Sequence, residues 1–140
     1  MREKPSLLII DDDENIRETL SDIFQEKGYL TETAKNGLQA IQKSQVKFYN
    51  IALIDVQLPD ITGVELLRTF RERYPSRMNI IITAHVTVKT AIDAVNLGAN
   101  AYIMKPIDFR KLDQIIKQCL KKQRKALKIT QERVAEFITL

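Results

Sequence analysis

The sequence predicts an α/β protein built on one parallel sheet, and two observations lead to this class. Short strand candidates alternate with helix candidates five times along the 140 residues, as in βα units joined by right-handed crossovers. The strand candidates are almost unbroken apolar runs, for example at 7–10 and 51–54. Strands of a parallel sheet are apolar on both sides because helices cover both faces. We therefore expect a single sheet with helices on each face.

Ten elements are expected in order along the chain. The strands are expected at 7–10, 29–34, 51–54, 79–83 and 101–104. The helices are expected at 14–27, 38–44, 64–73, 86–97 and from 109 onward. Turn residues separate these segments, since Gly28, Asn36-Gly37, Pro75 and Gly98 fall between them and suit turns or helix ends. The alternating pattern of 29–34 predicts an edge strand.

The last helix is expected to be long and basic. Residues 1–104 carry 12 Lys and Arg against 14 Asp and Glu, a net charge of −2, whereas residues 105–140 carry 10 against 4, a net charge of +6. Neither Gly nor Pro follows Phe109. Apolar residues can form one stripe along the helix, interrupted by Gln123 and Thr130: Leu112, Ile116, Leu120, Leu127, Val134 and Phe137. A helix of this length predicts a coiled-coil segment that could pair two copies, with a frayed tail as the alternative.

Composition limits the class of protein. A chain of this length with 44% hydrophobic residues forms one domain. No apolar run approaches the length of about 20 residues that spans a bilayer, and the N-terminus lacks a signal peptide's apolar region, so we expect a cytoplasmic protein without a membrane partner. Cys119, the only cysteine, is expected in the core or an interface. Direct nucleic-acid binding is not expected, because no reading motif accompanies the basic helix.

Polar side chains follow four of the predicted strands at the point where each strand ends. Asp11 and Asp12 follow the first, Asp55 the third, Thr83 ends the fourth and Lys105 follows the fifth. The carboxyl ends of parallel strands meet at one edge of the sheet, where ligands of such sheets bind. Three carboxylates placed together repel one another, so this set predicts a site for a hard divalent cation. Magnesium fits oxygen ligands of this kind, and manganese could take its place.

The same residues suit phosphoryl transfer. An aspartate can act as the nucleophile and form an aspartyl phosphate. A metal ion and a lysine would stabilise the charged oxygens of the transition state, and a threonine hydroxyl can donate to another phosphoryl oxygen. Each residue alone is weak evidence, but together at the ends of four buried strands they favour this chemistry.

Four motifs resemble the receiver domain of two-component response regulators: LLIIDDDENIR, IALIDVQLPDITG, NIIITAH and AYIMKP. The resemblance covers about residues 5–122 and implies a flavodoxin-like doubly wound fold with strand order 2-1-3-4-5. It also implies that a histidine kinase or phosphotransfer protein phosphorylates Asp55. Magnesium would then be held by Asp12, Asp55 and the main-chain oxygen of Gln57, with Asp11 acting mainly through water.

The resemblance further implies how a phosphoryl group is held and how the signal leaves the site. Lys105, the Thr83 hydroxyl and the main-chain nitrogen of Ala84 would bind the phosphoryl oxygens. Thr83 would move toward that group, and Tyr102 would turn inward to fill the vacated space. Gln57 and His85 would influence the lifetime of the phosphoryl group.

Several further positions carry expectations. Pro106 is expected to follow a cis peptide bond, as in the family. Asp13 is expected to cap the first helix or to add to the electric field of the site, rather than to bind metal directly. Ile107 stands where the family often has Phe, and Asn100-Ala101 replaces a commonly acidic pair. This last departure argues against the charged dimer face of one large transcription-factor subfamily.

Other functions remain open from the residues alone. A phosphatase-like enzyme of the haloacid dehalogenase type would form an aspartyl phosphate, but it requires a second acid where this chain has Gln57. A flavin-binding electron carrier could share the topology, but DDDEN replaces its hydroxyl-rich loop. A degenerate receiver could act only as a binding module. We expect a receiver domain at 5–122, feeding an output domain or effector, and a basic helical extension at 123–140 that is a linker or coiled-coil segment.

Overall fold

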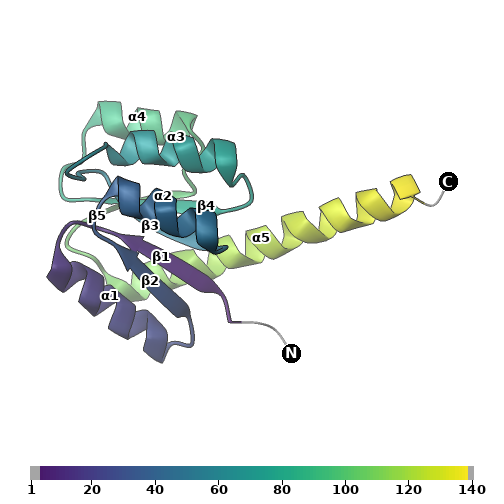
Figure 1. Ribbon diagram of the computed structural model, residues 1–140, viewed down its shortest axis with the longest axis horizontal. Helices are drawn as coiled ribbons and strands as arrows, with labels where there is room; N and C mark the ends of the chain where they lie inside the picture. The colour runs from purple at the N-terminus through teal and green to yellow at the C-terminus, as the bar shows by residue number, and fades with distance from the viewer. Residues whose placement is uncertain (1–3, 139–140) are drawn as a thin grey trace.

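The computed structural model describes residues 4–138, which form a five-stranded sheet and five helices (Figure 1). All strands pair in parallel, in the order β2-β1-β3-β4-β5. The flavodoxin-like doubly wound fold and its strand order are thereby confirmed. The strands are β1 Ser6–Ile10, β2 Leu30–Ala34, β3 Ile51–Asp55, β4 Met78–Thr83 and β5 Ala101–Met104. The helices are α1 Glu14–Glu26, α2 Gly37–Val46, α3 Gly63–Arg73, α4 Val88–Asn96 and α5 Phe109–Ile138.

Two apolar layers cover the sheet because side chains of a strand alternate between its faces. Leu7 and Ile9 of β1 face the layer formed with α1 and α5, whereas Leu8 and Ile10 face α2, α3 and α4. Figure 1 shows the same division, with α1 and α5 on one side of the sheet. Cys119 lies in the first layer and is buried, so the prediction of a core position is confirmed.

Side-chain caps fix the starts of the helices. Asp13 caps α1, as predicted, and accepts hydrogen bonds from the backbone nitrogens of Asn15 and Ile16. The prediction that the fourth helix begins at Val86 was wrong by two residues. Thr87 and Thr90 form a reciprocal capping box, and such a box satisfies the free N–H groups of a helix start. The helix therefore begins at Val88.

The edge of the sheet formed by the N-terminal ends of the strands holds a buried arginine. Arg77, just before β4, is 1% exposed and lies over the rings of Tyr49, Phe70 and Tyr74 at 5.5, 4.6 and 4.3 Å. Its guanidinium donates hydrogen bonds to the Ser44 hydroxyl and the Tyr49 carbonyl. Burial lowers the pKa of Arg77 to about 10. We call this group the Arg77 cage.

Helix α5 projects from the body at the same edge (Figure 1). Where it departs, the Gln123 amide donates to the carbonyls of Asn50 and Ser76 and accepts from the Asn50 amide, at 3.0, 2.8 and 3.0 Å. Beyond this point Leu127, Val134 and Phe137 are exposed. Among the helices of residues 4–138, none is both long and apolar enough to cross a membrane.

Candidate functional site

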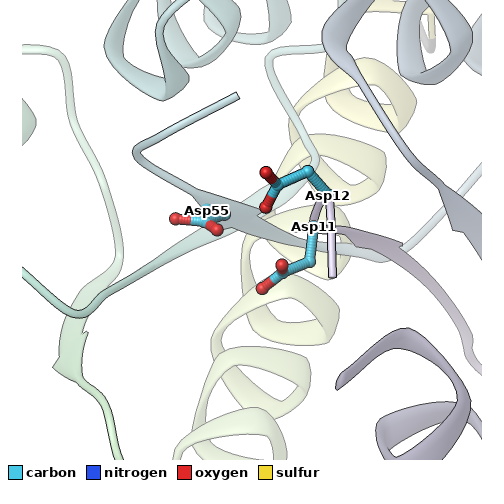
Figure 2. Close-up of side chains that lie close together, drawn as sticks. All are labelled: Asp11, Asp12 and Asp55. Atoms are coloured by element: carbon cyan, nitrogen blue, oxygen red, sulfur yellow. The ribbon is translucent and has the colours of Figure 1, made fainter. Parts of the chain in front are cut away.

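The carboxyl ends of the strands bring the predicted acidic residues together. Asp11 and Asp12 follow β1, and Asp55 is the last residue of β3. Each supplies a carboxylate oxygen to a group in which these oxygens lie within 4.8 Å of one another. Figure 2 shows the three side chains lying close together at the ends of these two neighbouring strands. The predicted cluster is therefore present, and its geometry suits a cation bound by oxygen atoms.

Lys105 follows β5 and reaches across to the same group. Its Nζ atom donates to Oδ2 of Asp11 at 2.9 Å and to Oδ2 of Asp55 at 3.3 Å. Asp11 and Asp55 are almost completely buried. The ammonium therefore contacts two of the three carboxylates, and the guanidinium of Arg17 donates to the main-chain oxygen of Asp11 at 2.8 Å. The three carboxylates outnumber these two cations, so the site can accept a further cation.

The protonation equilibria reflect this crowding. Burial raises the pKa of Asp55, and the nearby charge of Asp11 raises it further, against the opposing effects of Gln57 and Lys105. Burial also acts to lower the pKa of Lys105, but its contacts with Asp11 and Asp55 outweigh that effect and raise it. The lysine is therefore held in its charged form beside the carboxylates.

The carboxylates differ in which oxygens are already engaged. Asp11 accepts from the backbone nitrogen of Asp13 through Oδ1 and from Lys105 through Oδ2. Asp55 accepts from the backbone nitrogen of Gln57 and from Lys105. The exposed Asp12 carboxylate has no hydrogen bond or ion pair within residues 4–138. Of the three, Asp12 offers the freest oxygens for a metal ion.

Thr83 and the residues after it form the next part of the site. Thr83 is fully buried at the end of β4, and its hydroxyl accepts from the nitrogen of His85 at 3.0 Å and donates to its carbonyl at 3.2 Å. Ala84 and His85 are exposed. The Thr83 hydroxyl is thus occupied by its own loop and must exchange these bonds before it can donate to a bound group.

Tyr102 lies on β5, the strand that precedes Lys105. Its hydroxyl shares a 2.9 Å hydrogen bond with the hydroxyl of Thr90 in α4. Thr90 also bonds Thr87 in the capping box of that helix. The tyrosine is therefore tied to the start of α4. The peptide bond between Lys105 and Pro106 is cis, as predicted.

Comparison with known proteins decides the family. A sequence profile described as the response regulator receiver domain matches residues 7–117. The chain belongs to this family. The receiver domain has curated relatives such as the transcriptional regulatory protein ZraR of Klebsiella oxytoca, 34% identical over 118 residues that cover 84% of this chain and 27% of ZraR. The regulatory protein AtoC of Escherichia coli is 32% identical, over 84% of this chain and 25% of AtoC.

Solved structures agree with this assignment. The CheY-like receiver domain protein from Methanospirillum hungatei superposes with a TM-score of 0.87 at 35% identity, covering 89% of this chain and 99% of that one. The response regulator TrrA from Thermotoga maritima, solved in complex with Mg²⁺-BeF, has a TM-score of 0.75 at 30% identity, covering 82% and 98%. The receiver domain spans about a quarter of the length of ZraR and AtoC. None of these comparisons favours the phosphatase-like or electron-carrier hypotheses.

Two residues beside the site were not predicted from the sequence. Asp60, in the loop after β3, accepts three backbone hydrogen bonds, two of them from the start of α2. Thr90 holds the hydroxyl of Tyr102. An acid between Pro59 and Gly63 indicates a turn, but its sequence position does not reveal a partner more than 20 residues away.

Proposed function

We propose that this receiver domain is a phosphorylation-activated signalling switch in which Asp55 accepts a phosphoryl group from a histidine kinase or phosphotransfer protein. One observation carries the proposal: the carboxylates of Asp11, Asp12 and Asp55 meet within 4.8 Å, and Lys105 contacts two of them. This arrangement has a nucleophile, a cation and oxygen ligands for a second cation in one place. These groups supply the electrostatic stabilisation that phosphoryl transfer requires.

The second cation is proposed to be Mg²⁺, which Mn²⁺ could replace. Asp12, Asp55 and the main-chain oxygen of Gln57 would bind it directly. Asp11 would act mainly through water, while its oxygens accept from the backbone nitrogen of Asp13 and from Lys105. The similar TrrA structure was solved in complex with Mg²⁺-BeF, which supports this assignment. When bound, the ion would neutralise charge on the phosphoryl oxygens and on the carboxylates.

The chain's own residues would assist the transfer. A carboxylate oxygen of Asp55 forms the new bond to phosphorus as the bond from phosphorus to the donor breaks. Lys105 would exchange its contact with Oδ2 of Asp55 for a phosphoryl oxygen, and the Thr83 hydroxyl and Ala84 nitrogen would bind others. The phosphoryl group would leave Asp55 by hydrolysis, in which water attacks phosphorus and the carboxylate is released with inorganic phosphate. The exposed positions of Gln57 and His85 would influence how readily water reaches phosphorus.

Thr83 and Tyr102 are proposed to transmit the change. Thr83 would give up its two bonds to His85 when it turns toward the phosphoryl group. Tyr102 would then leave Thr90 and turn inward, which releases the start of α4. The phosphoryl group favours the second arrangement because it makes new contacts only there.

The phosphodonor protein is proposed to dock beside Lys105. A cavity of about 290 Å³ lies there between α1 and the segment after β5, and its lining includes Ile16, Ile107 and Phe109. An apolar hollow next to charged reacting groups can bind a helix of the donor while leaving Asp55 accessible. Such an encounter would take place in the cytoplasm.

We further propose that residues 5–122 form the receiver unit and 123–140 an extension toward an output domain or effector. The extension is helical up to Ile138, and residues 139 and 140 lie outside the described residues. The exposed stripe of Leu127, Val134 and Phe137 supports pairing of two copies through a coiled coil. A chain shortened after Lys125 keeps Gln123 and should still be phosphorylated but lose self-association in light scattering. An unchanged oligomeric state would contradict the coiled coil alone.

Intact-mass spectrometry tests the function. The full chain is incubated with acetyl phosphate and Mg²⁺, and we expect one added phosphoryl group. Asp55→Asn should show none, and chelation of the metal ion should suppress the adduct on the unaltered chain. An adduct that persists on Asp55→Asn would remove Asp55 from its proposed role.

A further inference from the structure

The loop between β3 and α3, residues 56–62, is closed at its base against the proposed phosphoacceptor. The backbone nitrogen of Gly63 donates to the carbonyl of Val56 at 2.8 Å. A Cβ atom at Gly63 would lie 2.4 Å from the carbonyl oxygen of Asp55 and 2.7 Å from the Cα atom of Val56, closer than real Cβ contacts. The two ends of the loop are therefore held together immediately beside Asp55.

The tip of this loop is held by a different element. Asp60 accepts from the backbone nitrogen of Gly37 through Oδ1 at 2.9 Å and from that of Leu38 through Oδ2 at 2.8 Å. Its Oδ1 also accepts from the nitrogen of Ile61 at 2.9 Å. These backbone bonds outweigh desolvation and lower the pKa of Asp60, so the carboxylate stays ionised near neutral pH. Asp60 thus joins the loop to the start of α2.

The start of α2 is arranged to receive this carboxylate. The first N–H groups of a helix have no partner within the helix, and the partial positive charge there favours an anion. The helix's own cap, Asn36, accepts only from Gln39 at 2.8 Å. That leaves the N–H groups of Gly37 and Leu38 for Asp60.

Gly37 also permits the close approach of the loop tip. A Cβ atom at this position would lie 2.3 Å from Cγ1 and 2.5 Å from Cδ1 of Ile61. A side chain at residue 37 would therefore force the Ile61 side chain to move and would crowd Oδ1 of Asp60, which lies 3.3 Å from the Cβ position. The hydrogen bonds of Asp60 and the missing side chain of Gly37 are two independent parts of the same contact.

Gln57 lies between the fixed base and the fixed tip. Its backbone nitrogen already donates to Oδ1 of Asp55 at 3.1 Å. We propose that Asp60 is a positioning residue that fastens the loop 56–62 to the start of α2 and so holds the main-chain oxygen of Gln57 ready for the metal ion. This inference rests on the proposed function of the site. A loop without this tether would spend only part of its time in the competent conformation, and the apparent dissociation constant would rise by the inverse of that fraction.

Metal affinity measured without phosphorylation tests the proposal. The free Mn²⁺ signal in electron paramagnetic resonance gives the dissociation constant of the full chain and its variants. For Asp60→Ala we expect a dissociation constant about three to ten times that of the unaltered chain. Gly37→Ala should also raise the Mn²⁺ dissociation constant, although this substitution changes no charge.

Two further variants distinguish the hydrogen bonds between Asp60 and α2 from the charge of Asp60 and from a general loss of stability in α2. Asp60→Asn loses the charge but keeps one oxygen acceptor, so it should bind more tightly than Asp60→Ala. Asn36→Ala removes the helix's own cap and destabilises α2 without touching the loop, so its metal affinity should match the unaltered chain. Urea unfolding confirms that each variant is folded under the assay conditions.

The metal affinities of these variants test the role of Asp60 separately from the phosphorylation of Asp55. Equal affinities for Asp60→Ala and the unaltered chain would overturn the proposal, as would an equally large change in Asn36→Ala. If Asp60→Asn binds as weakly as Asp60→Ala while Gly37→Ala is unaffected, charge and not position explains the effect, and the proposal is also overturned. Phosphorylation of Asp55 at saturating metal would remain intact in each of these cases.

Discussion

The two edges of the sheet each hold a cationic side chain, half-buried Lys105 at one and fully buried Arg77 at the other, but surround it with opposite chemistry. At the carboxyl edge, Lys105 faces Asp11 and Asp55, with Asp12 close by. At the other edge, Arg77 faces three aromatic rings, and no acidic side chain within residues 4–138 forms an ion pair with it. Lys105 therefore lies in a site with excess negative charge, whereas Arg77 lies against the neutral, electron-rich faces of rings.

This difference separates a binding edge from a stabilising edge. Charge left over at the carboxyl edge can be neutralised by a bound cation, so that edge suits a metal ion and, with it, a phosphoryl group. The Arg77 cage joins α2, α3 and the residue before β4 through ring contacts and hydrogen bonds. Substitutions at the first edge should change chemistry, and those at the second should change stability.

The largest effect is expected for Lys105→Met. Loss of one preorganised charged donor typically costs a factor of about 10² to 10³ in rate, so phosphorylation by acetyl phosphate should slow by that amount. Lys111→Met, at an exposed lysine of α5, serves as the control and should react at the normal rate. A Lys105→Met rate within threefold of normal would show that the ammonium has little part in the transfer.

At the other edge, Arg77→Ala should destabilise the fold and leave the chemistry intact. It removes a fully buried side chain, its ring contacts and two hydrogen bonds, so the free energy of unfolding in urea should fall by about 3 kcal/mol. The phosphorylation rate of the folded variant should be unchanged. A loss of stability below about 1 kcal/mol would contradict the structural importance of the Arg77 cage.

Asp55→Asn should stabilise the protein when no divalent cation is present. Burial and the charge of Asp11 raise the pKa of Asp55, so between the unfolded and folded pKa values the folded state binds more protons. The stability of the unaltered chain therefore falls as pH rises through the folded pKa of Asp55. At neutral pH the variant should be more stable by on the order of 1 kcal/mol.

Chemical denaturation across pH checks this expectation. The free energy of unfolding of Asp55→Asn should exceed that of the unaltered chain by an amount that increases from acidic to neutral pH. This excess should shrink when Mg²⁺ is added, because the ion binds and stabilises only the folded unaltered site. A variant less stable than the unaltered chain at every pH would mean that Asp55 is well accommodated without a metal ion.

A smaller effect is expected where α5 leaves the body. Gln123→Ala removes three partly exposed hydrogen bonds to Asn50 and Ser76. The free energy of unfolding in urea should therefore fall by about 1 kcal/mol. Gln118→Ala, at an exposed position of the same helix, should change stability little. Equal effects of the two substitutions would mean that Gln123 does not anchor the helix.

Much of the binding edge could be predicted from the sequence. Apolar runs such as 7–10 and 51–54 identify buried strands, and parallel strands bring their carboxyl ends to one edge. The residues after those runs were therefore expected to meet, and Asp11, Asp12, Asp55 and Lys105 do meet. The prediction succeeded because each residue's position depends only on the strand that precedes it.

Contacts made by residues that do not directly follow a strand of the sheet could not be predicted. Asp60 reaches Gly37, Gln123 reaches Asn50 and Arg77 reaches Ser44, across 23, 73 and 33 residues respectively. Each depends on how a loop or helix end packs after the sheet has formed. In the sequence, Gln123 was only a polar interruption in an apolar stripe, and nothing marked Arg77 as buried.

The most direct test is to locate the phosphoryl group chemically. The full chain is phosphorylated with acetyl phosphate and Mg²⁺ and reduced with borohydride, which converts an acyl phosphate into an alcohol and releases phosphate. The digested chain is then sequenced by tandem mass spectrometry. We predict that the reduced side chain is found at residue 55 alone. Reduction at Asp11 or Asp12, or phosphate retained on Thr83 or His85 with residue 55 unmodified, would contradict the account.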